Sequence, residues 1–404
     1  MSKTALCSAL LAGTVAATLA AAPALAQKKY DPGASDTEIK IGQTMPYSGP
    51  ASSYGTVGQV MAAYFEKINA EGGIDGRKIT FISYDDGFST PKTVEQTRKL
   101  VEGDEVLFVA SSLGTAPNVA VQKYLNSRKV PQLFVVSGAT RWGDPKNFPW
   151  TIGWQPSYQK EGALLARYAL KTNSAAKIGI LFQNDDSGKD YVKGFKAGLG
   201  EAATQIVAET SYELSDPTVD SQIIALKSAG VDTFFLHANP RFSAQAIRRA
   251  YELNWRPAML IASVGASVGA ALAPAGLEKS VGAVTAAYLK DPTDKVWADD
   301  KGYLEWLAFM KQWYPRGNLS DAGNAQGYSL AQTIALVLKQ CGDDLTRENV
   351  MKQAASLKDV ELPMLLPGIR LNTSPEDFFP VEDMRLARFD GTTWVVMDQA
   401  EGKP

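Results

Sequence analysis

The chain has 404 residues and carries 41 Lys and Arg against 43 Asp and Glu, so its formal net charge is −2 at pH 7. This balance argues against the basic stripe of a general nucleic-acid binder, and no nucleic-acid partner is expected. A chain of this length predicts two domains whose cores form by burial alone.

The N-terminus has the features of a secretory leader. Lys3 precedes an apolar run from Ala5 to Ala22, and Ala24-Leu25-Ala26 matches the small-x-small cleavage pattern. Residues 1–26 are therefore predicted to be a cleaved signal peptide, with a retained anchor as the alternative. The mature protein is expected to be a soluble periplasmic monomer, and its single cysteine, Cys341, allows no intramolecular disulfide.

Short apolar runs alternate with amphipathic stretches in two successive sets. In the first set, strands are expected at Ile39–Met45, Ile79–Tyr84, Val106–Ser111 and Gln132–Val136, and helices at Gly55–Asn69, Pro91–Val101 and Pro117–Ser127. In the second set, strands are expected at Lys177–Gln183, Ile206–Leu214, Thr233–Ala238 and Ala258–Ala262, and helices at Lys189–Leu199, Thr218–Ala229 and Phe242–Leu253. This α/β alternation predicts two doubly wound, mostly parallel, Rossmann-like lobes.

Two extended segments, Trp150–Ser157 and Val281–Tyr288, are expected to cross between the lobes. Long helices are expected at Tyr303–Tyr314 and Ala322–Gln340, and Asp390-Gly391 near the end of the chain is a hairpin signal. The resulting boundaries are an N-terminal lobe of residues 36–153 plus about 286–365 and a C-terminal lobe of residues 154–285 plus about 366–404, with the ligand cleft between them.

Signals for catalysis or metal binding are weak. The single histidine, His237, cannot build a metal site alone, and the chain has neither a nucleophile elbow nor a phosphate-binding loop. Asp85 and Asp86 are the best carboxylate pair, but neighbouring residues on a strand point to opposite faces. They are therefore expected to cap the turn after their strand. No enzyme activity, cofactor or metal is expected, and a secreted hydrolase stays as the enzymatic alternative.

Polar, glycine-rich sequences follow four of the predicted strands. They are Ser48-Gly49-Pro50 with Tyr54, Gly114-Thr115, Ser137-Gly138-Ala139-Thr140 and Asp186-Ser187-Gly188. Ligands of doubly wound sheets bind at the carboxyl ends of strands, beside helix N-termini that favour anions. The pattern therefore predicts a site for a small carboxylate.

The blocks SGP…YG (48–55), NAEGGIDGRK (69–78) and YDD (84–86) are similar to those of the leucine/isoleucine/valine-binding protein family, the type I periplasmic binding proteins of ABC importers. The resemblance covers nearly the whole mature chain. It implies two lobes, joined by a three-crossing hinge, that close over one solute. It also implies a partner, an ABC permease in the inner membrane, that takes the solute from the closed form.

The resemblance further implies a set of ligand-binding residues. In the family, a hydroxyl residue after the third strand and an Ala-x-Thr segment after the fourth hold the ligand carboxylate, and an aromatic residue after SGP packs on the ligand. The matching positions, with those of the second lobe, are Tyr54, Thr115, Gly138, Ala139, Thr140, Ser187, Asn239 and Ser263. Two further aromatic residues, Tyr47 and Trp154, are cleft candidates, with core packing as the competing interpretation.

The stretch around Ser263 departs from the family. Members that bind α-amino acids place an acid there to hold the ammonium, whereas no acid lies between Arg256 and Glu278. A buried ammonium without a carboxylate is costly, so an aromatic or short-chain organic acid is the favoured ligand. Two alternatives stay open: a branched-chain amino acid whose ammonium Asp185 or Asp186 holds, and a ligand sensor that feeds a regulator.

Overall fold

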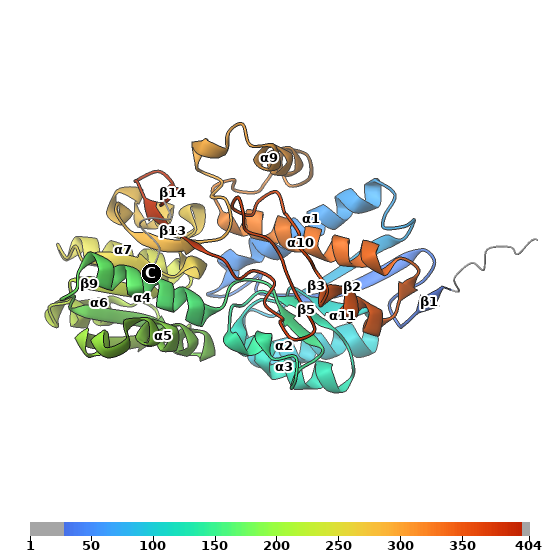
Figure 1. The fold of residues 1–404 in the computed structure, drawn as a ribbon, viewed down its shortest axis with the longest axis horizontal. Helices are drawn as coiled ribbons and strands as arrows, with labels where there is room; N and C mark the ends of the chain where they lie inside the picture. The colour runs from blue at the N-terminus through green and yellow to red at the C-terminus, as the bar shows by residue number, and fades with distance from the viewer. Residues whose placement is uncertain (1–27, 398–404) are drawn as a thin grey trace, which may run out of the picture.

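A computed structural model describes residues 28–397, which form two α/β lobes, each built on its own sheet (Figure 1). The predicted signal peptide lies outside the described residues. The first sheet has five parallel strands in the order β3-β2-β4-β5-β6. Their bounds are Glu38–Met45 (β2), Lys78–Asp85 (β3), Phe108–Ala110 (β4), Gln132–Val135 (β5) and Thr151–Gly153 (β6).

The second sheet has seven strands in the order β14-β13-β11-β10-β9-β7-β8. Five of them run parallel, and the hairpin β13–β14 adds an antiparallel edge beside β11. Their bounds are Ile178–Gln183 (β7), Ile206–Tyr212 (β8), Thr233–His237 (β9), Ala258–Ile261 (β10), Val284–Ala287 (β11), Arg385–Phe389 (β13) and Trp394–Val396 (β14). A short separate pair joins Lys29–Tyr30 (β1) to Asp344–Leu345 (β12).

Helices cover both faces of each sheet, as a parallel sheet requires. In the first lobe they are Gly55–Ala70 (α1), Thr90–Arg98 (α2), Thr115–Ser127 (α3), Lys301–Trp313 (α9), Ala322–Cys341 (α10) and Arg347–Ala354 (α11). In the second lobe they are Tyr158–Thr172 (α4), Asp186–Leu199 (α5), Asp220–Ser228 (α6), Pro240–Glu252 (α7) and Ala273–Ala275 (α8). α1 and α10 lie on one face of the first sheet, and α2 and α3 lie on the other (Figure 1).

The predicted α/β alternation is confirmed: every strand expected in the two sets lies in one of the sheets, although β4 is shorter than its predicted run. The hairpin signal is also confirmed, because Asp390-Gly391 joins β13 to β14 and Gly391 has φ 104°. The chain passes between the two sheets after β6, after β11 and before β13.

Two segments differ from the predictions. Val281–Tyr288 was expected to be a crossing, but its centre forms β11, which pairs with both β10 and β13, so the chain leaves the second sheet only at Tyr288. Helix α4 was not predicted at all. Its inner face carries the buried acid Glu161 among apolar residues such as Leu165 and Ala169, and this acid interrupts the apolar period that predicts a helix.

Candidate functional site

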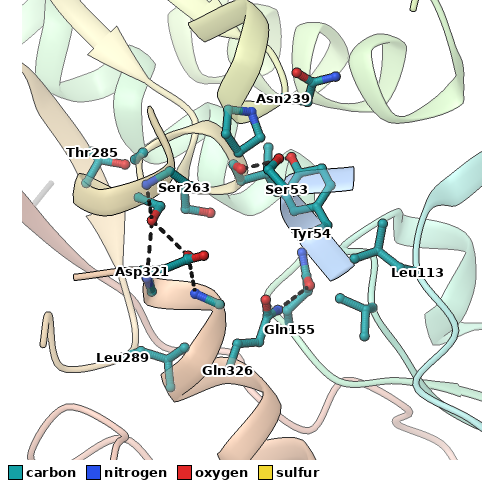
Figure 2. Close-up of a pocket in the computed structure, with 18 of the residues that line it drawn as sticks. Ser53, Tyr54, Leu113, Gln155, Asn239, Ser263, Thr285, Leu289, Asp321 and Gln326 are labelled. Carbon is teal, nitrogen blue, oxygen red and sulfur yellow. Dashed lines mark hydrogen bonds between the residues drawn. The ribbon is translucent and has the colours of Figure 1, made fainter. Parts of the chain in front are cut away.

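A cavity of about 170 Å³ lies between the two sheets, at the carboxyl ends of strands from both lobes (Figure 2). This is where doubly wound sheets bind ligands. The residues that line it include Ser53, Tyr54, Leu113, Thr115, Gln155, Ser187, His237, Asn239, Ser263, Thr285, Leu289, Asp321 and Gln326. Side chains far apart in the sequence therefore enclose one space.

Five of the ten predicted site residues line this cavity: Tyr54, Thr115, Ser187, Asn239 and Ser263. They come from four different helix starts and from the loop after β10. The cavity thus brings together predicted residues from both lobes.

The other five predicted residues lie outside the lining of this cavity. Tyr47 points to Ser83, whose Oγ lies 2.6 Å from the phenolic oxygen. Trp154 is fully buried and donates from Nε1 to Thr333 at 3.1 Å. The aromatic rings of Tyr47 and Trp154 therefore pack away from the cavity.

Gly138, Ala139 and Thr140 lie behind the cavity. A side chain at Gly138 would collide with the ring of Tyr158, which itself lines the cavity. Ala139 and Thr140 line a separate groove together with Thr115, Arg141, Asp186, Lys189, Asp190 and Lys193. The backbone N–H of Thr140 donates to Asp190 at 2.7 Å, and its hydroxyl donates to the same oxygen at 2.9 Å. Thr140 therefore links the first lobe to α5 of the second.

The residues considered as catalytic candidates, Asp85, Asp86 and His237, have structural roles or are buried. Asp85 accepts hydrogen bonds from the backbone of Tyr47, Ser48 and Gly87, and Asp86 accepts them from Phe88 and Thr93. Their expected role as turn caps is confirmed. His237 is buried, and burial lowers its pKa to about 4, so the ring is neutral near pH 7. Within residues 28–397, no group of three or more His, Cys, Asp and Glu side chains could hold a metal ion.

One side of the cavity offers hydrogen-bond donors. Helix α3 begins there, no side chain caps its N-terminus, and an uncapped N-terminus favours an anion. The hydroxyl of Thr115 lies 2.7 Å from that of Ser137, so Ser137 can donate to it and leave the Thr115 proton free. The hydroxyl of Ser53 is buried and has no partner among the described residues. These groups can bind a carboxylate without a lysine or arginine.

Three other helices that reach the cavity are capped by their own side chains. Asp185 accepts from the backbone of Ser187 and Gly188 at the start of α5, and Asn239 accepts from Phe242 at the start of α7. Asp321 accepts from Gly323 at the start of α10. Capping satisfies backbone donors that an anion would otherwise use. The uncapped start of α3 is therefore better suited to an anion than these three.

The lining contains two acids that the sequence did not predict there. Asp321 and Asp291 both line the cavity, and burial raises the pKa of each carboxyl above its usual value. A signal for Asp321 was present, because an aspartate directly before a predicted helix is a typical N-cap. Neither Asp185 nor Asp186, the earlier candidates for an ammonium, lines this cavity.

A third acid, Glu161, supports the cavity wall from behind. It is 2% exposed, and its carboxylate accepts from the backbone N–H of Ser263 at 2.7 Å and from the hydroxyls of Ser263 and Tyr191, both at 2.8 Å. Burial raises the pKa of Glu161 to about 7, although these hydrogen bonds favour the charged form. Glu161 on α4 thus holds the Ser263 loop in place.

Contacts across the cleft hold the two lobes against each other. The Tyr54 hydroxyl donates to the carbonyl of Val264 at 2.9 Å, and the Ser267 hydroxyl donates to Asp321 at 3.0 Å. The backbone N–H of Gly269 donates to Ser320 at 2.8 Å. The structure is therefore a closed arrangement in which both lobes surround the cavity.

Comparisons with known proteins agree with this architecture. A family model described as "Periplasmic binding protein" matches residues 38–393. The "Leu/Ile/Val-binding protein homolog 7" of Brucella suis is 26% identical over 367 residues, which cover 87% of this chain and 86% of that protein.

Two solved structures show the same fold at low identity. A branched-chain amino acid ABC transporter protein from Thermus thermophilus with bound valine has TM-score 0.80 and 15% identity, covering 90% of this chain and 96% of that one. A solute-binding protein of an ABC transporter from Rhodopseudomonas palustris, in complex with 3,4-dihydroxybenzoic acid, has TM-score 0.74 and 17% identity, covering 89% and 96%.

The extent of the family match and the closed cavity between two α/β lobes both indicate a periplasmic binding protein. None of the helices within residues 28–397 combines the length and apolar character that crossing a membrane requires. The family model and the fold are those of solute-binding proteins. The chain belongs to the periplasmic binding protein family, in the type I branch that includes the leucine/isoleucine/valine-binding proteins.

Proposed function

We propose that this protein captures a small organic acid in the periplasm by closing its two lobes over it, and delivers it to the permease of an ABC importer in the inner membrane. The predicted signal peptide, residues 1–26, would direct export and then be cleaved, and the protein would act as a monomer. We further propose lobes of residues 36–153 with about 288–384 and residues 154–287 with 385–397, because β11 extends the second sheet to Ala287 and β13 rejoins it at Arg385.

The observation that carries the proposal is the cavity, which residues of both lobes line. A solute held there would contact Thr115 from the first lobe and Ser187 and Ser263 from the second. Since a ligand shifts a conformational equilibrium only by binding one state better, contacts to both lobes favour the closed form. The permease would then recognise the closed shape of the protein, which the bound solute favours.

The donor side of the cavity supports a carboxylate ligand. The uncapped start of α3, the hydroxyl of Thr115 and the unpartnered hydroxyl of Ser53 lie where an anion would be favoured. A buried, unpartnered hydroxyl is unusual in a native protein, and a bound ligand would satisfy it.

The size of the cavity supports a compact ligand. A protein cavity of about 150 Å³ is known to hold a single benzene ring, and this cavity has about 170 Å³. Phe88, Leu113, Val136 and Leu289 add apolar surface to the lining. An aromatic or short-chain organic acid suits this space.

A branched-chain amino acid is the second candidate. The observation in its favour is Asp321, which places a carboxylate in the lining and could accept an ammonium. The solved structures of this fold include a protein with bound valine and one in complex with 3,4-dihydroxybenzoic acid, so the fold admits both classes.

A thermal-shift screen of residues 27–404 against single-ring aromatic acids, short-chain organic acids and amino acids tests the proposal. A ligand at about 100 times its dissociation constant adds roughly 2.7 kcal/mol of stability, which such a screen detects. A shift with aromatic or aliphatic acids supports the first candidate, and a shift with leucine or valine supports the second. If no carboxylate in the screen raises the melting temperature, the proposed ligand class is wrong.

A further inference from the structure

Asp321 has a free hydrogen-bond acceptor that faces the cavity. One oxygen, Oδ1, accepts from the backbone of Gly323 and from the hydroxyl of Ser267, both at 3.0 Å. The other oxygen accepts no hydrogen bond within residues 28–397, and Asp321 forms no salt bridge with any described lysine or arginine. Figure 2 shows the carboxylate directed into the open centre of the pocket.

The cation in the lining does not neutralise Asp321. Lys290 pairs instead with Asp300, which is the N-cap of α9. The other acid of the lining, Asp291, accepts from the backbone and the hydroxyl of Thr293 at Oδ1, and the backbone of Trp394 also hydrogen-bonds to its carboxylate. Asp321 is therefore the carboxylate of this lining that remains available to a solute.

Two hydroxyls in the lining also act as acceptors toward the cavity. Tyr54 donates its proton to the carbonyl of Val264, and Thr285 donates its proton to the carbonyl of Ile261 at 2.7 Å. A carbonyl oxygen can only accept, so both hydroxyl protons are committed to the protein. Each oxygen then offers only lone pairs to a ligand.

The uncapped start of α3 and the free oxygen of Asp321 belong to different parts of the lining. In Figure 2, Thr285, Ser263 and Asp321 lie on one side of the pocket, and Leu113, two residues before Thr115, lies on the opposite side. A ligand carboxylate against Asp321 would place two like charges together in a closed site. The carboxylate is therefore directed toward Thr115, and another part of the ligand meets Asp321.

We infer that Asp321 recognises a hydrogen-bond donor on the ligand, so that the solute carries a hydroxyl or ammonium group at the end remote from, or beside, its carboxylate. This inference rests on the proposed function and makes it narrower. A solute without such a donor would leave the free oxygen of Asp321 enclosed and unpaired once the lobes close. Enclosing an unpaired acceptor costs affinity, so Asp321 is a specificity-determining residue.

The test compares ligands that differ only in the donor. Calorimetric titrations of residues 27–404 would use 4-hydroxybenzoate against benzoate, and leucine against 4-methylpentanoate. We expect the member with the donor, in at least one pair, to bind at least about 10-fold more tightly than its partner. Preference within the first pair identifies a hydroxyl, and preference within the second identifies an ammonium.

The matched variant is Asp321→Asn. Asparagine caps a helix about as well as aspartate, so α10 and its contact with Ser267 are retained. The preference for the donor-bearing ligand should shrink toward equality in this variant, and thermal unfolding of the empty protein shows whether its fold is intact. An Asp321→Asn protein that melts early would be replaced by Asp321→Ser, which also provides a cap.

The outcomes separate the inference from the proposed function. Equal binding of both members of each pair, or an unchanged preference in the folded Asp321 variant, overturns the role of Asp321 and leaves the carboxylate proposal standing. If none of the four acids binds, both the inference and the organic-acid proposal are overturned for this class of ligand.

Discussion

The two sides of the cavity differ in how their polar groups are already used. On the side of α3, no side chain caps the helix, and Ser137 can donate to the Thr115 hydroxyl and leave the Thr115 proton free. On the side of α10 (Figure 2), Asp321 caps the helix, and the Thr285 hydroxyl donates to a backbone carbonyl. The first side therefore offers donors and the second offers acceptors.

The groups that a lining offers to a ligand therefore depend on the internal hydrogen bonds of that lining. Thr115 and Thr285 are the same residue type, yet only Thr285 has its proton committed to a carbonyl. A count of hydroxyl groups would treat the two sides alike. From the hydrogen-bond partners we predict that a ligand binds in one orientation, with its carboxylate toward α3.

The largest expected effect concerns Glu161, which supports the acceptor side through Ser263. Because its folded-state pKa is raised to about 7 from the usual 4.5, the folded protein binds this proton more tightly than the unfolded chain. Its contribution to the free energy of unfolding is fully present below pH 4.5 and is lost as pH rises through about 7. The loss is on the order of 3 kcal/mol.

Urea unfolding at several pH values, with Glu161→Gln as the control, measures this loss. Wild type should lose stability relative to the variant between pH 5 and 8. Buried His237, whose pKa is lowered to about 4, changes stability in the opposite direction at acid pH. Because both proteins contain His237, the difference between them isolates the contribution of Glu161. If the free energies of unfolding of the two proteins change with pH in the same way, Glu161 has the same pKa in the folded protein as in the unfolded chain.

The next effect is expected at Thr115, on the side of the cavity where α3 begins. Thr115→Val removes a hydroxyl donor while keeping the shape of the side chain, and it should weaken carboxylate binding by about 2 kcal/mol, the scale of a hydrogen bond to a charged group. Calorimetry with a carboxylate found in the screen measures the change, and Thr115→Ser should retain most of the affinity. Unchanged binding by Thr115→Val would place the carboxylate elsewhere.

Tyr54→Phe tests the link between the two lobes. The change removes the hydrogen bond to Val264 and leaves the ring, so binding should weaken by about 1 kcal/mol. The melting temperature of the ligand-free protein should change little, because the contact forms only when the lobes are closed. A large drop in that melting temperature would instead show that the Tyr54 hydroxyl supports the fold.

The smallest expected effect belongs to Ser267→Ala. The hydroxyl of Ser267 donates to Asp321 and accepts from the backbone of Ala322 at 3.2 Å, both in the other lobe. Its removal should weaken the closed form by about 1 kcal/mol or less and lower the apparent affinity several-fold. Small-angle X-ray scattering at one subsaturating ligand concentration should show a larger mean radius of gyration than wild type. An unchanged radius and affinity would show that this contact does not favour closure.

Local patterns in the sequence predicted much of the fold. The strands, the hairpin at Asp390-Gly391 and the placement of the cavity at strand ends all follow from periodicity and turn chemistry, which act over short distances. Helix α4 was not predicted, because its buried acid, Glu161, pairs with Ser263, 102 residues away. No local pattern reports such a pairing.

The candidate site was predictable only in part for the same reason. Tyr54, Thr115 and Ser263 follow strands or begin helices, and the structure brings them to one cavity. Asp321 was overlooked because its position in the lining depends on how the first lobe meets the second. The orientation of Thr140, which turns to Asp190 on α5, likewise depends on contact between lobes.

A crystal structure of residues 27–404 with a carboxylate from the screen would locate the ligand directly. We expect a single bound molecule in the cavity between the lobes, with its carboxylate at Thr115 and the start of α3 and a donor group at Asp321. A carboxylate bound instead in the separate groove beside Arg141, Lys189 and Lys193, with the central cavity empty, would contradict this expectation.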